Sequence, residues 1–403
     1  MEVISYIFIF LGLYFEVFLI ISFLEKKPIN KENNNCELPE VTIIVPCFNE
    51  QDTISGTIHS LLRLNYPKEK LSIFVINDGS TDNTQKTLEQ FRETPQIRLL
   101  EKENGGKYTA LNLGISLAKT PFIGCLDADS FVNEDALVKM VSHFQDKNIM
   151  AVIPSIVVAE PKTFIQKMQK AEYNLGVFIR QALSIIWAIF VTPGPFSFFR
   201  KEVFDIVGEY RHAYNTEDLD MALRMQKKRM KILHVTDIVV HTSAPETIHK
   251  LYKQRVRWTS GFLDNIMENR DMIGNKKYWD LWVLVFPFAL VAILFSVPLF
   301  SISVINSSRA LWTRIEKAYF SGIYSWPFTK FDPFFIDINT INLLSLVLLA
   351  ITIIMLLWSK KIIDGKWKIN WDIFYFLFFR FLSVFWIGKS IYNHLLKKQT
   401  TWK

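Results

Sequence analysis

Hydrophobic residues gather at the two ends of the chain, while the middle alternates short apolar runs with polar segments. Residues 1–24 carry only two charged side chains and are followed by a cluster of lysines. A cleaved leader has basic residues ahead of a shorter apolar core, whereas this run is long enough to cross a bilayer. The pattern predicts an uncleaved transmembrane anchor over residues 1–25, with its amino terminus outside, and a polar linker over 26–37.

Three further apolar runs lie near the carboxyl terminus, at Leu281–Ile305, Ile341–Trp358 and Ile373–Gly388. They predict a C-terminal transmembrane region over residues 281–403 with about three spans. Four spans in all would leave the lysine-rich tail outside, against the bias of positive charge toward the cytoplasm. Either the last run is re-entrant or interfacial, or a further partial span lies around residues 318–336.

The middle of the chain follows the alternation of an α/β domain. Apolar runs predict strands at Val41–Pro46, Leu71–Ile76, Ile97–Leu100 and Phe122–Leu126. Between them, apolar residues at helical spacing predict helices over residues 54–62, from Ser80 or Thr81 to about Phe91, and over Lys107–Ala118. This alternation with short turns is typical of a mainly parallel sheet covered on both faces.

Polar side chains follow three of these strands at the point where each one ends. Asn49 and Glu50 follow the first strand, Asp78 the second, and Asp127 and Asp129 the fourth. In such sheets, ligands bind beyond the carboxyl ends of the strands. Carboxylates at positions i and i+2 of an extended segment point to the same side, which suits Mg²⁺ or Mn²⁺ bound together with a diphosphate. The alternative for the last two residues is a solvated turn before a helix.

Two further stretches carry side chains suited to catalysis. In Gly105-Gly106-Lys107 the glycines allow the backbone to approach a phosphate, and the lysine adds positive charge at a helix start. The alternative is an ordinary loop before a helix. Thr216-Glu217-Asp218 offers a carboxylate that can act as general base for an attacking hydroxyl. Its alternative is a plain helix start.

The stretch Gln254-Arg255-Val256-Arg257-Trp258 combines arginines with an aromatic ring. An arginine can stabilise a departing diphosphate, and a tryptophan offers a stacking face to a sugar. A basic segment beside a membrane span is the alternative.

Farther on, residues 263–280 have the pattern of an amphipathic interfacial helix. The segment from Tyr173 to Val191 is an interfacial helix, an acceptor groove wall or an ordinary core helix.

Composition narrows the function classes. The 403 residues carry 46 Lys and Arg against 39 Asp and Glu, a net charge of +7, and 50% of them are hydrophobic. Such a chain is not disordered, collagen-like or a disulfide scaffold. No basic-aromatic motif or groove-reading element accompanies the positive charge, so we expect no nucleic-acid partner. A transporter with an inactive α/β domain is disfavoured by the complete acidic set.

Together these motifs point to a family. In chain order, Asp78, Asp127-Ala128-Asp129, Thr216-Glu217-Asp218 and Gln254-x-x-Arg257-Trp258 form a set that resembles the membrane-embedded family 2 glycosyltransferases, which include poly-N-acetylglucosamine, hyaluronan, chitin and cellulose synthases. Val45–Glu50, Gly105–Lys107 with Ala110–Asn112, and Gly194 followed by Arg200 are also similar to that family. The likeness covers residues 38–265. One departure is Lys227-Lys228-Arg229, where the family usually has a glycine, so we expect a differently built turn.

The resemblance implies a GT-A fold over residues 38–262 that binds a UDP-sugar. By position it implies nucleotide-binding residues Pro46, Asn49, Glu50, Asp78, Lys107 and Asp127, with Asp78 on the uracil. It implies Asp129 and Asp127 as ligands of Mg²⁺ or Mn²⁺, Asp218 as catalytic base beside Glu217, and Gln254, Arg257 and Trp258 around the diphosphate and acceptor.

The resemblance further implies an inverting, multi-pass enzyme of the cell membrane with its catalytic domain in the cytoplasm. We expect UDP-N-acetylglucosamine as the favoured donor and a β-linked polysaccharide, passed across the membrane, as the product. The partners are then the UDP-sugar, a glycan or lipid acceptor, and membrane lipids. The alternative is transfer of one sugar to a lipid, as in ceramide glucosyltransferase-like or polyprenyl-phosphate enzymes. No gating loop of the cellulose synthase kind follows Trp258 and no regulatory domain is recognised, so we do not expect a cellulose product or cyclic-dinucleotide control.

Overall fold

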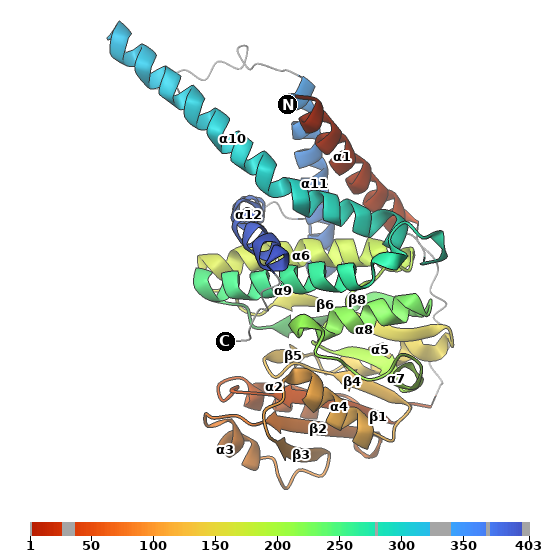
Figure 1. The fold of residues 1–403 in the computed structure, drawn as a ribbon. Coiled ribbons are helices and arrows are strands. Elements are labelled where there is room, and N and C mark those ends of the chain that lie inside the picture. Colours follow the sequence, from red (N-terminus) through yellow and green to blue (C-terminus); the bar gives the residue numbers. More distant parts are fainter. Residues whose placement is uncertain (1, 26–36, 279–280, 323–339, 368–370, 397–403) are drawn as a thin grey trace.

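The computed structural model describes residues 2–25, 37–278, 281–322, 340–367 and 371–396. Its parts lie in three layers (Figure 1): a sheet domain, two helices that lie across it, and long helices that rise away from those two. The two crossing helices are α6 (Phe164–Ile185) and α9 (Ile248–Glu268). The predicted linker lies outside the described residues except for Glu37.

An eight-stranded sheet forms the base, in the order β3-β2-β1-β4-β7-β6-β8-β5. The strands are β1 (Val41–Cys47), β2 (Leu71–Asp78), β3 (Ile97–Lys102), β4 (Phe122–Cys125), β5 (Ser130–Val132), β6 (Ile149–Val158), β7 (Ser197–Arg200) and β8 (Lys231–Thr242). The first four strands are mutually parallel, as predicted, and β6 and β8 are also parallel. Strand β7 runs antiparallel between β4 and β6, and β5 runs antiparallel to β8. The sheet is therefore mainly, but not wholly, parallel.

Helices cover both faces of the parallel part. All seven residues of β1 are buried, as expected of a strand enclosed on both sides. Ile43 belongs to the hydrophobic core that contains Ile58 of α2, whereas Ile44 belongs to the core that contains Leu111 of α4. The helices of this layer are α2 (Ile54–Leu62), α3 (Thr84–Glu89), α4 (Lys107–Leu117), α5 (Ala136–Ser142), α7 (Glu202–Val207) and α8 (Glu217–Lys227).

Two local predictions need correction. Helix α3 is shorter than the helix expected from Ser80 or Thr81, because the Asp82 carboxylate accepts a hydrogen bond from the Thr84 backbone N–H at 2.9 Å and holds the preceding residues in a turn. The turn after α8 was expected to differ from one built on glycine. Arg229 nevertheless takes the glycine conformation, with φ 57°, and the bond from Met230 N to Met225 O completes a Schellman motif. The Arg229 guanidinium donates to the Lys277 carbonyl at 2.7 Å and holds the turn.

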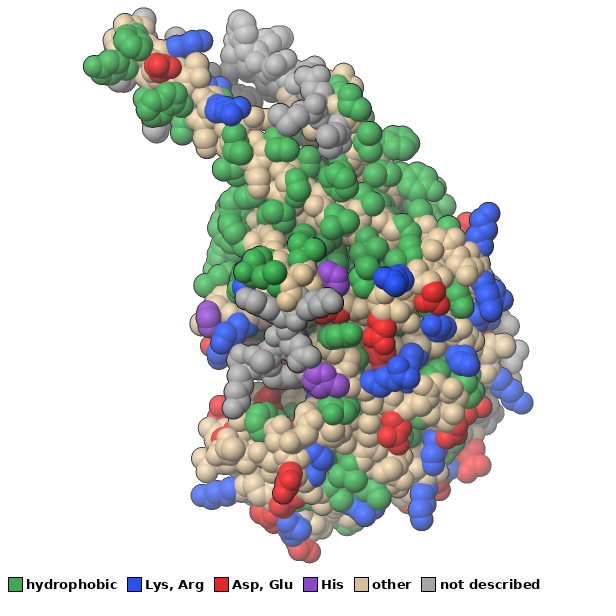
Figure 2. Space-filling view, viewed as in Figure 1, with side chains coloured by type: hydrophobic (Ala, Val, Ile, Leu, Met, Phe, Trp, Pro, Cys, Tyr) green, Lys and Arg blue, Asp and Glu red, His purple; other side chains and the backbone are tan. Residues whose placement is uncertain are grey.

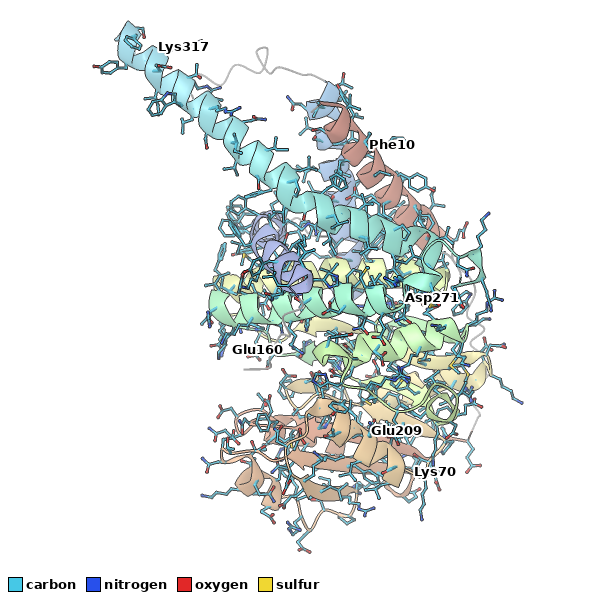
Figure 3. All side chains as sticks on the ribbon, viewed as in Figure 1. Phe10, Lys70, Glu160, Glu209, Asp271 and Lys317 are labelled. Carbon is cyan, nitrogen blue, oxygen red and sulfur yellow. The ribbon has the colours of Figure 1, made fainter. Side chains whose placement is uncertain are left out.

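Four helices in the described part of the chain are long and apolar enough to cross a membrane, which makes this a membrane protein. They are α1 (Glu2–Leu24), α10 (Phe286–Ser321), α11 (Thr340–Asp364) and α12 (Asp372–Leu395). Hydrophobic side chains gather over this upper part, and charged ones over the sheet domain (Figure 2). Phe10 is 66% exposed on α1, and Lys317 lies at the end of α10 remote from the sheet (Figure 3).

The helix boundaries differ from the apolar runs at two places. Helix α10 continues past Ile305 to Ser321 and ends where Gly322 adopts a left-handed conformation. Most of the partial span considered around 318–336 lies outside the described residues. Helix α9 runs through the expected domain boundary at residue 262 and ends at Glu268. Two short 3₁₀ turns follow, so the segment 263–280 is not one separate helix.

Helices α6 and α9 join the sheet domain to the membrane helices. Thr163 and Gln166 form a capping box that fixes the start of α6. Phe178 of α6 is fully buried, and it stacks on Trp358 of α11 at 5.9 Å and meets Phe23 of α1 at 4.6 Å. Helix α12 packs on α6 and α9 and is seen nearly end-on in Figure 1, unlike α1 and α11. The part of α6 that begins at Tyr173 therefore contacts both the sheet domain and the membrane helices.

Candidate active site

The residues predicted for the site gather at the carboxyl ends of β1, β2 and β4. Lys107 at the start of α4 forms an ion pair with Asp127 at 2.6 Å and a longer one with Glu217 at 3.6 Å. Burial alone lowers the pKa of Lys107, but the charges of Asp127 and Glu217 outweigh burial and hold this pKa above its ordinary value. The ion pairs bring together three residues that are far apart in the sequence.

Gly194 leaves room for this ion pair. A Cβ atom at this position would lie 2.3 Å from Asp127 Oδ1 and 2.5 Å from Lys107 Nζ. Real Cβ atoms do not approach so closely, so only glycine fits beside the pair in this arrangement. The sequence drew attention to Gly194 without giving it a role.

Asp129 faces other carboxylates. Burial first, and then the negative charges of Asp127 and Glu50, raise the pKa of Asp129 to about 7. Its Oδ1 accepts hydrogen bonds from Ser130 at 3.1 Å and from Thr242 at 3.3 Å. The pKa of Glu50 is also raised, mainly by burial. Acidic groups that raise one another's pKa favour a cation between them.

The metal set is smaller than a complete protein site. In the described ranges, no group of three or more His, Cys, Asp or Glu is placed to hold a metal ion. Mg²⁺ and Mn²⁺ accept few protein carboxylates when substrate phosphates supply the other oxygens. The hard oxygens of Asp127 and Asp129 therefore fit a divalent cation that binds together with a diphosphate.

Helix α8 places the predicted base. Glu217 and Asp218 are the first two residues of this helix. Their position therefore agrees both with a plain helix start and with the functional interpretation. Burial, and then the negative charge of Glu217, raise the pKa of Asp218 to about 6. Its Oδ1 accepts the Leu219 backbone N–H at 2.9 Å, and its carbonyl accepts the Thr192 hydroxyl at 3.1 Å. The first bond orients the carboxylate, and the second holds the backbone that carries it.

Helix α9 closes the same side of the site. Burial lowers the pKa of Arg257, while the charges of Glu217, Asp218 and Asp127 oppose this shift, so the guanidinium lies among these carboxylates. Trp258 is 36% exposed and keeps part of its ring open to solvent.

The other motif residue on α9 is Gln254. Its Oε1 is buried and has no hydrogen-bond partner in the described part of the chain. A buried amide oxygen without a protein partner is costly to a fold, and this one is left to accept a hydrogen bond from water or a ligand.

Helix α9 approaches α8 closely because Gly261 has no side chain. A Cβ atom there would lie 2.5 Å from the Thr216 side chain. Asn265 donates from Nδ2 to the Thr216 hydroxyl at 3.0 Å and to the Gly261 carbonyl at 2.8 Å. This contact sets Arg257 on α9 against Asp218 on α8.

The predicted uracil contact, Asp78, has partners within the protein. It is 3% exposed, and its carboxylate accepts hydrogen bonds from Lys102 at 2.6 Å and from the N–H groups of Gly105 at 3.1 Å and Gly106 at 2.8 Å. The two glycines therefore direct their N–H groups at Asp78, which shapes the loop before Lys107. Contact with uracil stays a prediction.

The remaining predicted nucleotide residues lie close by in β1 and its loop. Pro46 is buried in β1. Asn49 has φ 57° and accepts from the Thr81 N–H at 2.8 Å, so it joins the loops that follow β1 and β2. Glu50 accepts from the Thr53 hydroxyl at 2.6 Å. Their contacts with a nucleotide stay predictions.

Sequence reasoning missed a second group of residues beneath Trp258. Arg255 forms a bidentate ion pair with Glu172 of α6, with nitrogen–oxygen distances of 3.2 and 2.9 Å. Arg255 stands inside the Gln254–Trp258 stretch, which was the available signal. Glu172 lies 83 residues away and had no signal in the sequence.

A surface pocket of about 920 Å³ lies elsewhere, between the start of α6 and the start of α12. Its lining includes Lys167 and Lys170 together with residues 371–375 and Leu377. None of the predicted site residues lines it. The charged cluster around Lys107, and not this pocket, marks the candidate site.

Comparisons with known proteins agree with this geometry. Residues 42–208 match the family described as Glycosyl transferase family 2. Poly-beta-1,6-N-acetyl-D-glucosamine synthase of Staphylococcus aureus strain MSSA476 is 32% identical over 266 residues, which are 65% of this chain and 63% of the relative. The synthase of the same name from Staphylococcus epidermidis is 29% identical over 66% of this chain and 65% of its own length. The chain thus matches somewhat less than two thirds of these relatives.

One solved structure confirms the GT-A fold. The mannosyltransferase PcManGT from Pyrobaculum calidifontis, in complex with GDP-Man and Mn²⁺, superposes with a TM-score of 0.60 and covers 89% of this chain and 99% of its own. The two sequences are only 20% identical, so the likeness concerns the fold. The predicted α/β GT-A domain between apolar helices is confirmed.

Proposed function

Because residues 42–208 match the family described as Glycosyl transferase family 2, we propose that this chain is an inverting membrane glycosyltransferase that extends a β-linked polysaccharide. The favoured donor is UDP-N-acetylglucosamine, which the names of the relatives support. Passage of the polymer through the membrane is part of the same proposal.

The observation that carries the proposal is the meeting of opposite charges at one edge of the sheet. Lys107 and Arg257 supply positive charge, and Asp127 and Asp218 supply carboxylates, from four separate elements. Cationic side chains at this position suit a departing diphosphate. A carboxylate with a pKa near 6 suits the removal of a proton from a sugar hydroxyl.

The reaction follows from these positions. Asp218 accepts the proton of the acceptor hydroxyl while its oxygen forms a bond to the anomeric carbon of the donor. The bond from that carbon to the β-phosphate oxygen breaks on the opposite side, and UDP leaves with the electron pair, which inverts the anomeric centre. Lys107 and Arg257 stabilise the negative charge that grows on the diphosphate. Trp258 offers its exposed ring to the acceptor sugar.

A divalent cation completes the site. Asp129, with Asp127, would hold Mg²⁺ or Mn²⁺, as the pKa of about 7 of Asp129 among other carboxylates supports. The mannosyltransferase of the same fold was solved in complex with Mn²⁺, which agrees with this choice. The cation supplies charge neutralisation for the diphosphate when bound.

The helix arrangement supports an orientation with the sheet domain in the cytoplasm. Helix α1 enters from outside, and α10 and α11 form an outward and an inward crossing. We propose that helix α12, although long enough to span, lies at the interface and does not cross, which its packing on α6 and α9 supports. This choice between the two alternatives also puts the lysine-rich tail in the cytoplasm, where positive charge is favoured.

The test is UDP release by the purified full chain in detergent, with a panel of UDP-sugars and Mg²⁺ or Mn²⁺. We expect turnover with UDP-N-acetylglucosamine and a loss of about 100-fold or more in Asp218→Asn. Full turnover in that variant contradicts the assigned base. A ladder of products supports the polymerase, a single glycolipid supports transfer to a lipid, and no turnover with any UDP-sugar contradicts the proposal.

A further inference from the structure

Arg255 occupies an unusual place beneath the candidate acceptor site. Its side chain is 7% exposed, and both ends of its guanidinium fork donate to the two oxygens of Glu172. A two-point pairing of this kind fixes the plane of the guanidinium as well as its position. Glu172 stands on α6, so the pair ties α9 to the helix beneath it.

Aromatic rings from three helices surround the same guanidinium. Its carbon lies 4.4 Å from the ring centre of Trp258, 5.2 Å from that of Phe379 and 5.9 Å from that of Tyr173. These distances are within the range of cation–π attraction, which is strongest for tryptophan and for buried cations. Trp258 is therefore held from the buried side while 36% of its surface stays exposed.

Helix α12 is fastened to α9 next to this group. The Ser390 hydroxyl donates to the Val256 carbonyl at 3.2 Å, and His394 Nδ1 meets Asp264 Oδ1 at 2.5 Å. Phe379, which contacts Arg255, belongs to the same helix. A shift of α12 would therefore reach Trp258 through Arg255.

We propose that Arg255, fixed by Glu172, is a positioning residue that orients the Trp258 ring for the acceptor sugar. It does not touch the reacting atoms, and it acts through Trp258. The inference rests on the proposed function, because it assigns Trp258 to the acceptor side of that reaction. Lysine has neither the planar fork nor its stacking face, so it cannot replace Arg255 in this role.

The experiment compares Arg255→Lys and Glu172→Gln with the full-length wild type in detergent. The donor is UDP-N-acetylglucosamine, and the acceptor probe is a β-linked N-acetylglucosamine pentamer. We expect kcat/KM for the acceptor to fall by about 100-fold in Arg255→Lys, with KM for the donor within about twofold of wild type. Lys253→Met, an exposed change on the same helix, is the matched control and keeps both constants.

Two measurements separate positioning from general stability. The exchange Glu172→Arg with Arg255→Glu restores an ion pair but leaves no cation over Trp258, so we expect it to recover the melting temperature without recovering transfer. In a Trp258→Phe background, Arg255→Lys is expected to cost much less than in wild type, because the two residues act together.

Each outcome decides the question. An active Arg255→Lys or Glu172→Gln with an unchanged acceptor KM and kcat overturns the inference, as does recovery of transfer by the exchange, or additive losses with Trp258→Phe. A wild type that releases no UDP from any UDP-sugar overturns the proposed function, and with it the inference. Active wild type with a selective acceptor defect in the variants supports both.

Discussion

Gly194→Ala is a steric test of the candidate site, because it adds one methyl group beside the Lys107–Asp127 pair. The new Cβ would lie 2.3 and 2.6 Å from the two Asp127 oxygens and 2.5 Å from Lys107 Nζ. Gly194 is not among the glycines with positive φ, so alanine tolerates the backbone and the change acts through contact alone.

The size of the effect follows from these distances. Ordinary van der Waals contact begins near 3.4 Å, so the Asp127 carboxylate must move by about 1 Å. Lysine is long and can yield, but Asp127 is short and lies two residues after the end of β4. A misplacement of about 1 Å in a catalytic group costs about 100-fold in rate, or about 2.7 kcal/mol of transition-state stabilisation.

The assay is the steady-state rate of UDP release at varied UDP-N-acetylglucosamine. We expect kcat/KM for the donor to fall about 100-fold in Gly194→Ala, with the helix content and melting temperature close to wild type. Gly388→Ala is the matched control, because its Cβ would meet Val297 at an ordinary 3.6 Å. A folded Gly194→Ala with wild-type kcat/KM would refute the assignment of Lys107 and Asp127 to the reacting centre.

Two further predictions concern protons and metal. The pKa of Asp218 is raised to about 6 by burial and then by Glu217, so UDP release is expected to fall about tenfold per pH unit below pH 6; a flat profile contradicts the base. A raised pKa means that the folded state holds this proton more tightly than the unfolded chain does. The stability that the bound proton contributes is therefore lost as the pH rises through about 6. The melting temperature should fall with this rise in pH, and it should fall more in wild type than in Asp218→Asn. EDTA is expected to abolish transfer and added Mn²⁺ or Mg²⁺ to restore it, with more metal needed in Asp129→Asn; activity that persists in excess EDTA argues against the cation.

The sequence was most informative where function depends on local order along the chain. Asp127 and Asp129 follow a buried strand directly, and parallel strands end at one edge, so their meeting with Glu50 was predictable. The convergence of Lys107 with Asp127 and Glu217 was only implied by a resemblance, because no local pattern states which loops meet. The structure adds the distances that make it a charge cluster.

Contacts between distant segments had no counterpart in the sequence patterns. Hydropathy alone does not mark the end of α10. The last turns of this helix are polar but consist of good helix formers, so the helix continues until Gly322 ends it. Arg255 and Glu172 meet only after α6 and α9 have been laid side by side, and Lys102 reaches Asp78 from a neighbouring strand. Each of these pairings is decided by tertiary packing, which a periodicity of two or 3.6 residues does not encode.

The joined core of the sheet domain and the membrane helices has a consequence for how this protein can change. Leu19 of α1, Phe178 of α6, Phe286 of α10 and Met355 of α11 belong to one hydrophobic cluster with residues of the sheet. A fragment cut at the ends of the domain would expose that apolar surface to water and aggregate. The N-terminal anchor α1 is therefore part of the folded core and is not exchangeable for an unrelated membrane span. A substitution in one of these spans therefore requires a compensating substitution in α6. A transfer of this catalytic domain to the spans of another protein would have to include the helix surfaces that pack against α6.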